Sequence, residues 1–216
     1  MIKTAVGLLI AGVLVTGISY IMLRRYLHSD SFRKFLSAEA SDMAGVTGEF
    51  APFRWEGLAV ETDSFDAKGA GIVTGVRADG LHTEVGFGGV SRGVWEIKST
   101  SLKRLEVFVD ATKTVAEAVT AEVKRDSKKK PQPSGWLPRD AELQGLDVSE
   151  VSVKALLNEG PATAAGMKVH VEPAGAKNAY RAEVRGGTIC MPFKILPEIR
   201  LDRVRTRYQD KRVFLT

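Results

Sequence analysis

The sequence is poor in the residues that build most catalytic and metal sites. Its 216 residues include one cysteine and three histidines. The single cysteine, Cys190, excludes an internal disulfide and a multi-cysteine metal site, and we expect it to be a small buried hydrophobe. His28, His82 and His170 lack a partner at the spacing of metal ligands, such as HExxH. We therefore expect no metal site.

Catalytic and nucleotide-binding motifs are absent as well. No serine stands in a G-x-S-x-G turn, and no glycine pair belongs to a P-loop. The glycine-rich GFGG at 86–89 is followed by strand-like VWEI, whereas a nucleotide site would need a helix N-terminus there. We expect a non-enzymatic protein without a cofactor, and an anchored hydrolase is the minor alternative.

The chain is basic, with a formal net charge of +5 and a pI near 9.3. The basic excess lies at Arg24–Arg25, at Lys128–Lys130 and between Lys194 and Arg212. None of these runs alternates with stacking aromatic residues, so we do not expect nucleic acid as a partner. Anionic lipid and an ordinary solvated surface are the two explanations left open.

One long uncharged run extends from Ala5 to Leu23. As a helix it would span roughly 28 Å, close to the ~30 Å hydrocarbon core of a bilayer. The run predicts a transmembrane anchor within residues 1–25, with Arg24, Arg25 and Tyr26 at the membrane interface. A cleaved signal peptide is the alternative, although its apolar region is usually about 7–15 residues long. The flanking charges nominally favour a cytoplasmic C-terminal side, and large domains can be translocated against that bias.

Residues 26–47 predict an amphipathic juxtamembrane segment. Ser29 or Ser31 can cap a helix over 31–44, and Gly45 can end it. One face of this helix is apolar, so it can lie on the membrane or cover the end of a sheet. The apolar positions are Phe32, Phe35, Leu36, Ala40 and Met43.

From Phe53 the apolar period changes to two, which is typical of antiparallel strands with one apolar and one polar face. This part divides into a first β-unit with a helix at 113–125 (53–125), a basic, proline-containing linker (126–142) and a second β-unit (143–216). The apolar positions expected to line one face, either as core or facing lipid, are Leu58, Val60, Val76, Trp95, Ile97, Leu105, Val107, Val109, Val148, Val151, Val153, Val169, Val171, Ile199, Leu201 and Val204.

Short stretches of the first unit recur in the second unit in the same order. From the glycine pair onward, the offset between matched stretches stays near one hundred residues. We therefore expect two weak repeats of one β-unit. The matches are GLAV (57–60) with GLDV (145–148), GVRADG (75–80) with HVEPAG (170–175), EVGFGG (84–89) with EVRGG (183–187), WEI (95–97) with FKI (193–195), and TSLKRLEV (100–107) with IRLDRVRT (199–206).

The last matched pair shares an unusual spacing, which LDVSEVSV (146–153) repeats. Apolar or threonine side chains stand at relative positions 0, 2, 5 and 7, whereas a regular strand would give 0, 2, 4 and 6. One extra residue turns the following side chains to the other face, so a bulge or tight corner must return the apolar side inward. The pattern predicts a curved, twisted antiparallel sheet, shaped as a groove or half-barrel.

The order of these segments resembles the AsmA-like family of envelope proteins, which is related to the chorein-type bridge-like lipid-transfer proteins. An anchor is followed by a helix carrying FRKFLSAEASDMAG, and then GEFAPFRWEGLAVET leads into glycine-punctuated strands. The resemblance covers most of residues 1–110 and recurs loosely in 143–216. It implies a single-pass anchor in the inner membrane, a periplasmic sheet with an apolar concave face, and a role in phospholipid movement or envelope assembly. Proteins of this type are long, so a fragment and a short member with a partner are both open.

We expect an anchored sheet whose apolar face binds or conducts phospholipid acyl chains between membranes. The alternative is an anchored structural or assembly module that binds other envelope proteins through its sheet edges. An open apolar trough would favour the first function, and a filled sandwich core would favour the second.

Overall fold

The computed structural model describes part of the chain: Met22, 24–113, Pro138, 140–175, 179–193, Ile195, 197–209 and 212–215. The predicted anchor (1–25) lies outside these residues except for Met22, Arg24 and Arg25. Residues 114–125 of the predicted second helix and 126–137 of the predicted linker lie outside them as well. Within the described ranges, no helix is both long and apolar enough to cross a membrane.

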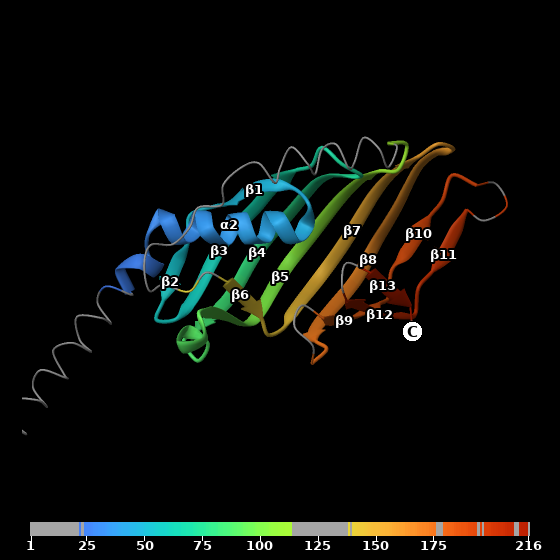
Figure 1. Ribbon diagram of the computed structural model, residues 1–216. Coiled ribbons are helices and arrows are strands. Elements are labelled where there is room, and N and C mark those ends of the chain that lie inside the picture. The colour runs from blue at the N-terminus through green and yellow to red at the C-terminus, as the bar shows by residue number, and fades with distance from the viewer. Residues whose placement is uncertain are drawn as a thin grey trace, which may run out of the picture.

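The described part is mainly β, as the sequence predicts (Figure 1). It contains the helix α2 (Asp30–Ala44), a short 3-10 turn η1 (Val90–Arg92) and one open sheet of 13 strands. The strands are β1 (Thr47–Phe50), β2 (Arg54–Glu56), β3 (Ala59–Lys68), β4 (Val73–Gly86), β5 (Val94–Asp110), β6 (Asp140–Leu143), β7 (Leu146–Leu157), β8 (Gly160–Pro173), β9 (Tyr180–Arg185), β10 (Thr188–Cys190), β11 (Glu198–Arg200), β12 (Arg203–Gln209) and β13 (Arg212–Leu215).

Helix α2 has a capping residue at each end, Ser29 and Gly45. The Ser29 hydroxyl accepts a hydrogen bond from the backbone N–H of Phe32 at 3.4 Å, and Gly45 ends the helix with a left-handed φ of 65°. The predicted helix is therefore confirmed to within one residue. Its buried Phe32 and Phe35 face the sheet, so the helix covers the sheet, which is one of the two placements that its apolar face allowed (Figure 1).

The strand order is β1-β3-β4-β5-β7-β8-β9-β12-β13, with β2, β6, β10 and β11 attached beside this path. Neighbours are antiparallel except that β5 pairs in parallel with both β6 and β7. The prediction of a wholly antiparallel sheet is wrong here, because alternation of side chains does not show strand direction. A parallel neighbour requires a crossover, and residues 111–139 connect β5 to β6. Strand β6 also begins inside the predicted linker, which therefore ends before Asp140.

The predicted repeats do not fall on equivalent strands. GVRADG and EVGFGG lie along one strand, β4, whereas their matches HVEPAG and EVRGG lie on the successive strands β8 and β9 and the turns that follow them. Of the match to WEI, Phe193 and Ile195 lie between β10 and β11, outside the described strands. Alternating residues that end in glycine occur wherever a strand meets a turn, so such matches arise without duplication.

The predicted corner is confirmed, and it runs across the whole sheet. In β3 the inward side chains are Val60, Thr62, Phe65 and Ala67, again at relative positions 0, 2, 5 and 7. Inward residues of neighbouring strands pair across the sheet and so form rows. One row is Thr62, Leu81, Leu102 and Val148. The next inward row is Phe65, Ala78, Leu105 and Val151. Between these two rows β3, β4, β5 and β7 each hold two residues that turn outward, and on β8 the outward pair lies one row further on, between Met167 and Ala164.

We call these outward pairs the corner row. Gly80, Gly166 and Gly186 lie in it with φ of 65°, 73° and 68°, a left-handed conformation that glycine adopts without strain. At the C-terminal end the corner becomes a break that separates β9 from β10 and β11 from β12. The pairs are Asp63–Ser64, Asp79–Gly80, Lys103–Arg104, Ser149–Glu150, Ala165–Gly166, Arg185–Gly186 and Asp202–Arg203.

Candidate functional site: the apolar inner face of the sheet

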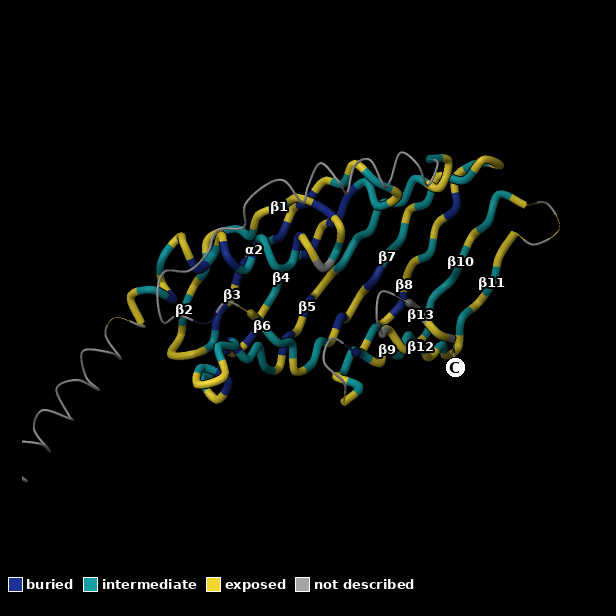
Figure 2. Tube along the Cα trace, in the orientation of Figure 1, coloured by how far each residue is buried: buried dark blue, intermediate teal, exposed yellow. Residues whose placement is uncertain are grey.

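The two faces of the sheet differ in chemistry. We call the face on which α2 lies the inner face and the opposite one the outer face. Inward side chains are almost all aliphatic, aromatic or threonine along every long strand, while the outward positions carry most of the charges. Figure 2 shows buried and intermediate segments alternating with exposed ones along the strands, as this arrangement requires.

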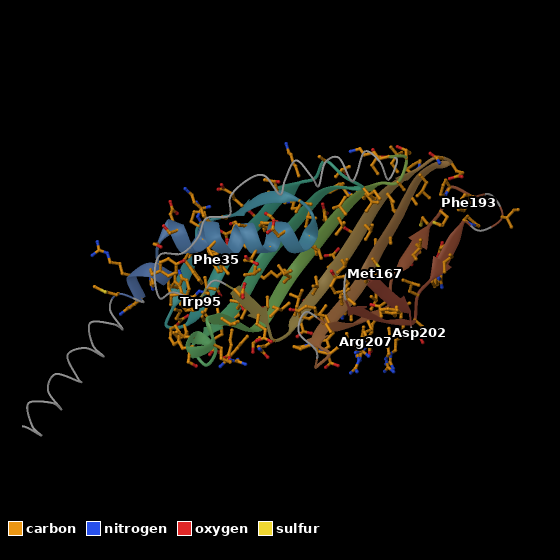
Figure 3. The ribbon with its side chains drawn as sticks, viewed as in Figure 1. Phe35, Trp95, Met167, Phe193, Asp202 and Arg207 are labelled. Carbon is orange, nitrogen blue, oxygen red and sulfur yellow. The ribbon has the colours of Figure 1, made fainter. Side chains whose placement is uncertain are left out.

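An aromatic cluster fills the part of the inner face beneath α2. Phe32 and Trp95 are both 0% exposed, and their ring centroids lie 5.5 Å apart (Figure 3 labels Trp95). Tyr26, which we expected at a membrane interface, packs into this cluster with its ring 5.6 Å from that of Phe32. Arg24 and Arg25 are exposed. This part of the face is therefore a filled core.

Beyond α2 the inner face is a wall with no second layer of described residues over it. The substantial contacts between elements are those of paired strands, of α2 with β1 and of η1 with β5. Along this wall Met167 is buried, and most of its neighbours are half-buried (Figure 3 labels Met167). The half-buried members are Leu105, Val107, Val109, Val153, Val169, Val171, Val184, Ile189, Ile199, Leu201 and Val204.

The threonine hydroxyls that face inward beneath α2 form hydrogen bonds with one another or with backbone carbonyls. The hydroxyls of Thr83 and Thr100 lie 2.7 Å apart, and Thr83 also donates to the carbonyl of Lys98 at 2.8 Å. Thr62 donates to the carbonyl of Ala51 at 2.9 Å. Because these hydrogen bonds are closed within the protein, Thr62, Thr83 and Thr100 do not interrupt the apolar face with unpaired hydroxyls.

The structure places fifteen of the sixteen predicted apolar residues on the inner face. The exception is Leu58, which is 36% exposed in the turn before β3. Five of the fifteen are buried, namely Val60, Val76, Trp95, Val148 and Val151. Sequence reasoning missed inward residues of β3, β4 and β8, although the spacing 0, 2, 5, 7 identifies them too. These are Phe65, Ala67, Ala78, Leu81, Ala162, Ala164 and Met167.

The prediction of a buried cysteine is wrong. Cys190 is exposed at the end of β10, because its neighbour Ile189 takes the inward position in this three-residue strand. Trp55 packs in the aromatic cluster with its ring 6.0 Å from that of Phe32. Trp136 lies outside the described residues.

The outer face is held by ion pairs between neighbouring strands. Both histidines in strands join carboxylates there: His82 Nδ1 lies 3.2 Å from Glu61 Oε1, and His170 Nδ1 lies 2.7 Å from Asp147 Oδ1. His82 thus contacts the next strand rather than Glu84, with which it shares a strand face. In the described ranges, no group of three potential metal ligands occurs.

Two carboxylates of the outer face are stabilised in their charged form. Two hydrogen bonds of 2.7 Å from Arg54 hold the pKa of Asp63 below its usual range. The hydrogen bond from Arg185 does the same for the pKa of Glu183, with a further contribution from Arg205.

A polar depression of about 720 Å³ opens where β5 leaves β6 and continues beside β7. Its lining carries charges of both signs, and within it Arg92 Nη2 lies 3.2 Å from Glu96 Oε1. The lining residues are Arg92, Glu96, Lys98, Ser99, Glu142, Gln144, Gly145 and Asp147. The depression is separate in chemistry from the apolar wall.

The inner face is thus a continuous apolar surface along the described strands. Comparison with protein-family models and with curated protein sequences finds no match to this chain.

Proposed function

We propose that the part of the inner face that no described residue covers binds the acyl chains of phospholipids, and that the protein is a membrane-anchored, non-enzymatic lipid-binding or lipid-conducting protein. The observation that carries this proposal is a continuous apolar wall on an open sheet whose other face is charged. Such a wall must be covered by something apolar. A 16-carbon chain would gain on the order of 10 kcal/mol from burial, before the entropic costs of binding.

The anchor, the location and the family belong to the same proposal. The uncharged run from Ala5 to Leu23 supports a single-pass membrane anchor. The resemblance of the sequence to AsmA-like proteins supports an inner-membrane anchor and a periplasmic sheet. Such a protein would take phospholipid from one membrane along the wall towards another.

The proposal is tested by native mass spectrometry of the full-length chain in a mild non-ionic detergent. We expect phospholipid to remain bound to the wild-type chain. Val153→Asp places a charge in the middle of the wall and should remove most of that lipid, because an acyl chain would have to desolvate the carboxylate. Ser152→Asp places the same charge one residue away on the outer face and should leave the bound lipid unchanged. Lipid that surrounds only the anchor would stay in both variants, and that result would refute the proposal.

A second candidate, an assembly module, is favoured by the difference between the sheet edges. The outer edge of β1 is closed by α2: Ser41 accepts from the backbone N–H of Gly48 at 3.0 Å, Ser37 accepts from that of Phe50 at 3.0 Å, and Arg33 donates to the Phe50 carbonyl at 2.7 Å. At the other end, β11 and β13 have no outer neighbour among the described strands. A partner strand added there would extend the sheet, and site-specific crosslinks at Phe214 would then join a second protein.

A further inference from the structure

A dense arginine cluster covers the outer face at the C-terminal end of the sheet. It lies on β9, on β12 and on the adjoining half of β8. The outward charged side chains there are six basic and two acidic, a net +4 with His170 neutral. They are Lys168, Arg181, Arg185, Arg203, Arg205 and Arg207, with Glu172 and Glu183; we call this set the arginine patch. Figure 3 labels Arg207 at the lower margin of the sheet, near the C-terminal end of the chain.

The rest of the outer face lacks this excess. On β3, β4 and β5 the outward charges are five basic and eight acidic, a net of −3. They are Lys68, Arg77, Lys98, Lys103 and Arg104 with Glu61, Asp63, Asp66, Asp79, Glu84, Glu96, Glu106 and Asp110. On the outer face of these described strands, the basic excess is therefore concentrated at the end of the sheet far from α2 (Figure 1).

The cross-strand pairing within the patch is costly for the protein alone. Arg203 stands directly opposite Arg185, and Arg207 stands directly opposite Arg181. Like charges in such positions repel and destabilise a sheet. One half-buried carboxylate, Glu183, neutralises part of the charge by contacting Arg185, Arg203 and Arg205. No ion pair joins Arg207 or Lys168 to another residue that the structure describes.

We propose that the arginine patch is a docking surface for an anionic phospholipid bilayer. The strands place cations in a grid, about 4.8 Å apart between strands and about 7 Å apart along each strand, which suits a planar array of phosphates. Guanidinium groups bind phosphate oxygens bidentately and keep their charge at any physiological pH. Each basic group near an anionic surface adds to the attraction.

A membrane surface fits the patch better than nucleic acid does. Single-stranded nucleic acid is bound with the help of stacking aromatic rings, and the outward positions of β8, β9 and β12 in the patch hold no Phe, Tyr or Trp. Tyr180 and Tyr208 of these strands form a pair on the opposite, inner side. The patch needs no acyl chain on the inner face, so this inference stands apart from the proposed function.

The test uses the full-length chain in phosphatidylcholine nanodiscs, mixed with vesicles that contain phosphatidylcholine alone or with phosphatidylglycerol. We expect co-flotation with the anionic vesicles only, weakening as salt is raised. Arg203→Gln with Arg207→Gln should weaken it about 30-fold, from about 5-fold for each arginine. Arg77→Gln with Arg104→Gln is the matched control, since Arg203 and Arg104 are exposed to the same extent, 51% and 52%. The control pair should change binding little.

Each other outcome overturns the inference. Equal binding to both kinds of vesicle, no binding to either, or an equal loss in the control pair would remove the patch as a bilayer-docking surface. Tighter binding of a single-stranded RNA at the same phosphate concentration would assign the patch to nucleic acid. Circular dichroism checks that the variants fold, and Lys168→Gln, which leaves every contact of Glu183 in place, serves as the second variant. Bound lipid in the mass-spectrometric test is measured separately, so the two proposals can fail independently.

Discussion

At the scale of single residues, Trp95 shows how tightly the covered part of the inner face is filled. Its side chain is fully buried, and its indole Nε1 is the only buried side-chain nitrogen or oxygen of the described residues that lacks a hydrogen-bond partner. The ring therefore contributes through packing with Tyr26, Phe32 and Phe87 and not through its N–H. An unpaired donor in such a place lowers stability.

This leads to a prediction for two substitutions at Trp95. Trp95→Ala should reduce the free energy of unfolding by about 3–5 kcal/mol, because it leaves a large cavity under α2. Trp95→Phe should cost much less, since it keeps most of the packing and removes the unpaired donor. Urea unfolding followed by circular dichroism measures both. An equal cost for the two variants would mean that the indole N–H has a partner.

At the scale of elements, side chains of α2 cover the free edge of β1 and hydrogen-bond to its backbone. Arg33, Ser37 and Ser41 lie at a spacing of four residues, so they form one stripe along the helix. That stripe supplies the hydrogen bonds which a neighbouring strand would otherwise give to β1. Exposed strand edges invite aggregation, and a covering helix is one of the known protections.

Removing both hydroxyls tests this closure. Ser37→Ala with Ser41→Ala leaves the backbone N–H groups of Gly48 and Phe50 unpaired, and it should cost about 1–3 kcal/mol for each group that water cannot reach. The variant should also aggregate faster than wild type in light scattering. Ser31→Ala, on an exposed position of the same helix, is the control and should change neither property. An unfolding midpoint equal to that of the control would show that α2 is held by its phenylalanines alone.

The corner row is the second structural feature at the scale of elements. Two outward residues in every long strand let the apolar side continue along one face after the bend. Without them the inner wall would change to polar halfway along each strand. The continuity of the wall, on which the proposed lipid binding depends, is thus a property of where these outward pairs fall in each strand.

At the scale of the whole molecule, the sheet is amphipathic and asymmetric in charge. Among the described residues, the inner face is filled under α2 and uncovered beyond it, while the outer face is net acidic on β3–β5 and strongly basic on β9 and β12. Lipid that binds only the folded state must raise the free energy of unfolding by mass action. This gives a prediction about ligand removal.

Stripping bound phospholipid from the full-length chain should lower its thermal unfolding midpoint, and returning phosphatidylglycerol should restore it. At a lipid concentration 100 times the dissociation constant, the stabilisation is about 2.7 kcal/mol. In Val153→Asp the midpoint should no longer respond to lipid, whereas in Ser152→Asp the response should persist. A wild-type midpoint that is the same with and without lipid would argue against a ligand on the inner face.

Much of this architecture could be predicted from the sequence, because it depends on local sequence patterns. The caps at Ser29 and Gly45, the alternation from β3 onward and the spacing 0, 2, 5, 7 depend only on residues near one another in the chain. Of the candidate site, the members on β5, β7 and β12 could be named for the same reason.

Tertiary structure alone decided the rest. It set the parallel pairing of β5 with β7 and the meeting of like-charged arginines on β9 and β12. It also exposed Cys190 and decided that α2 covers only one end of the wall. These depend on which distant segments become neighbours, and a side-chain period of two is the same whichever strand lies alongside.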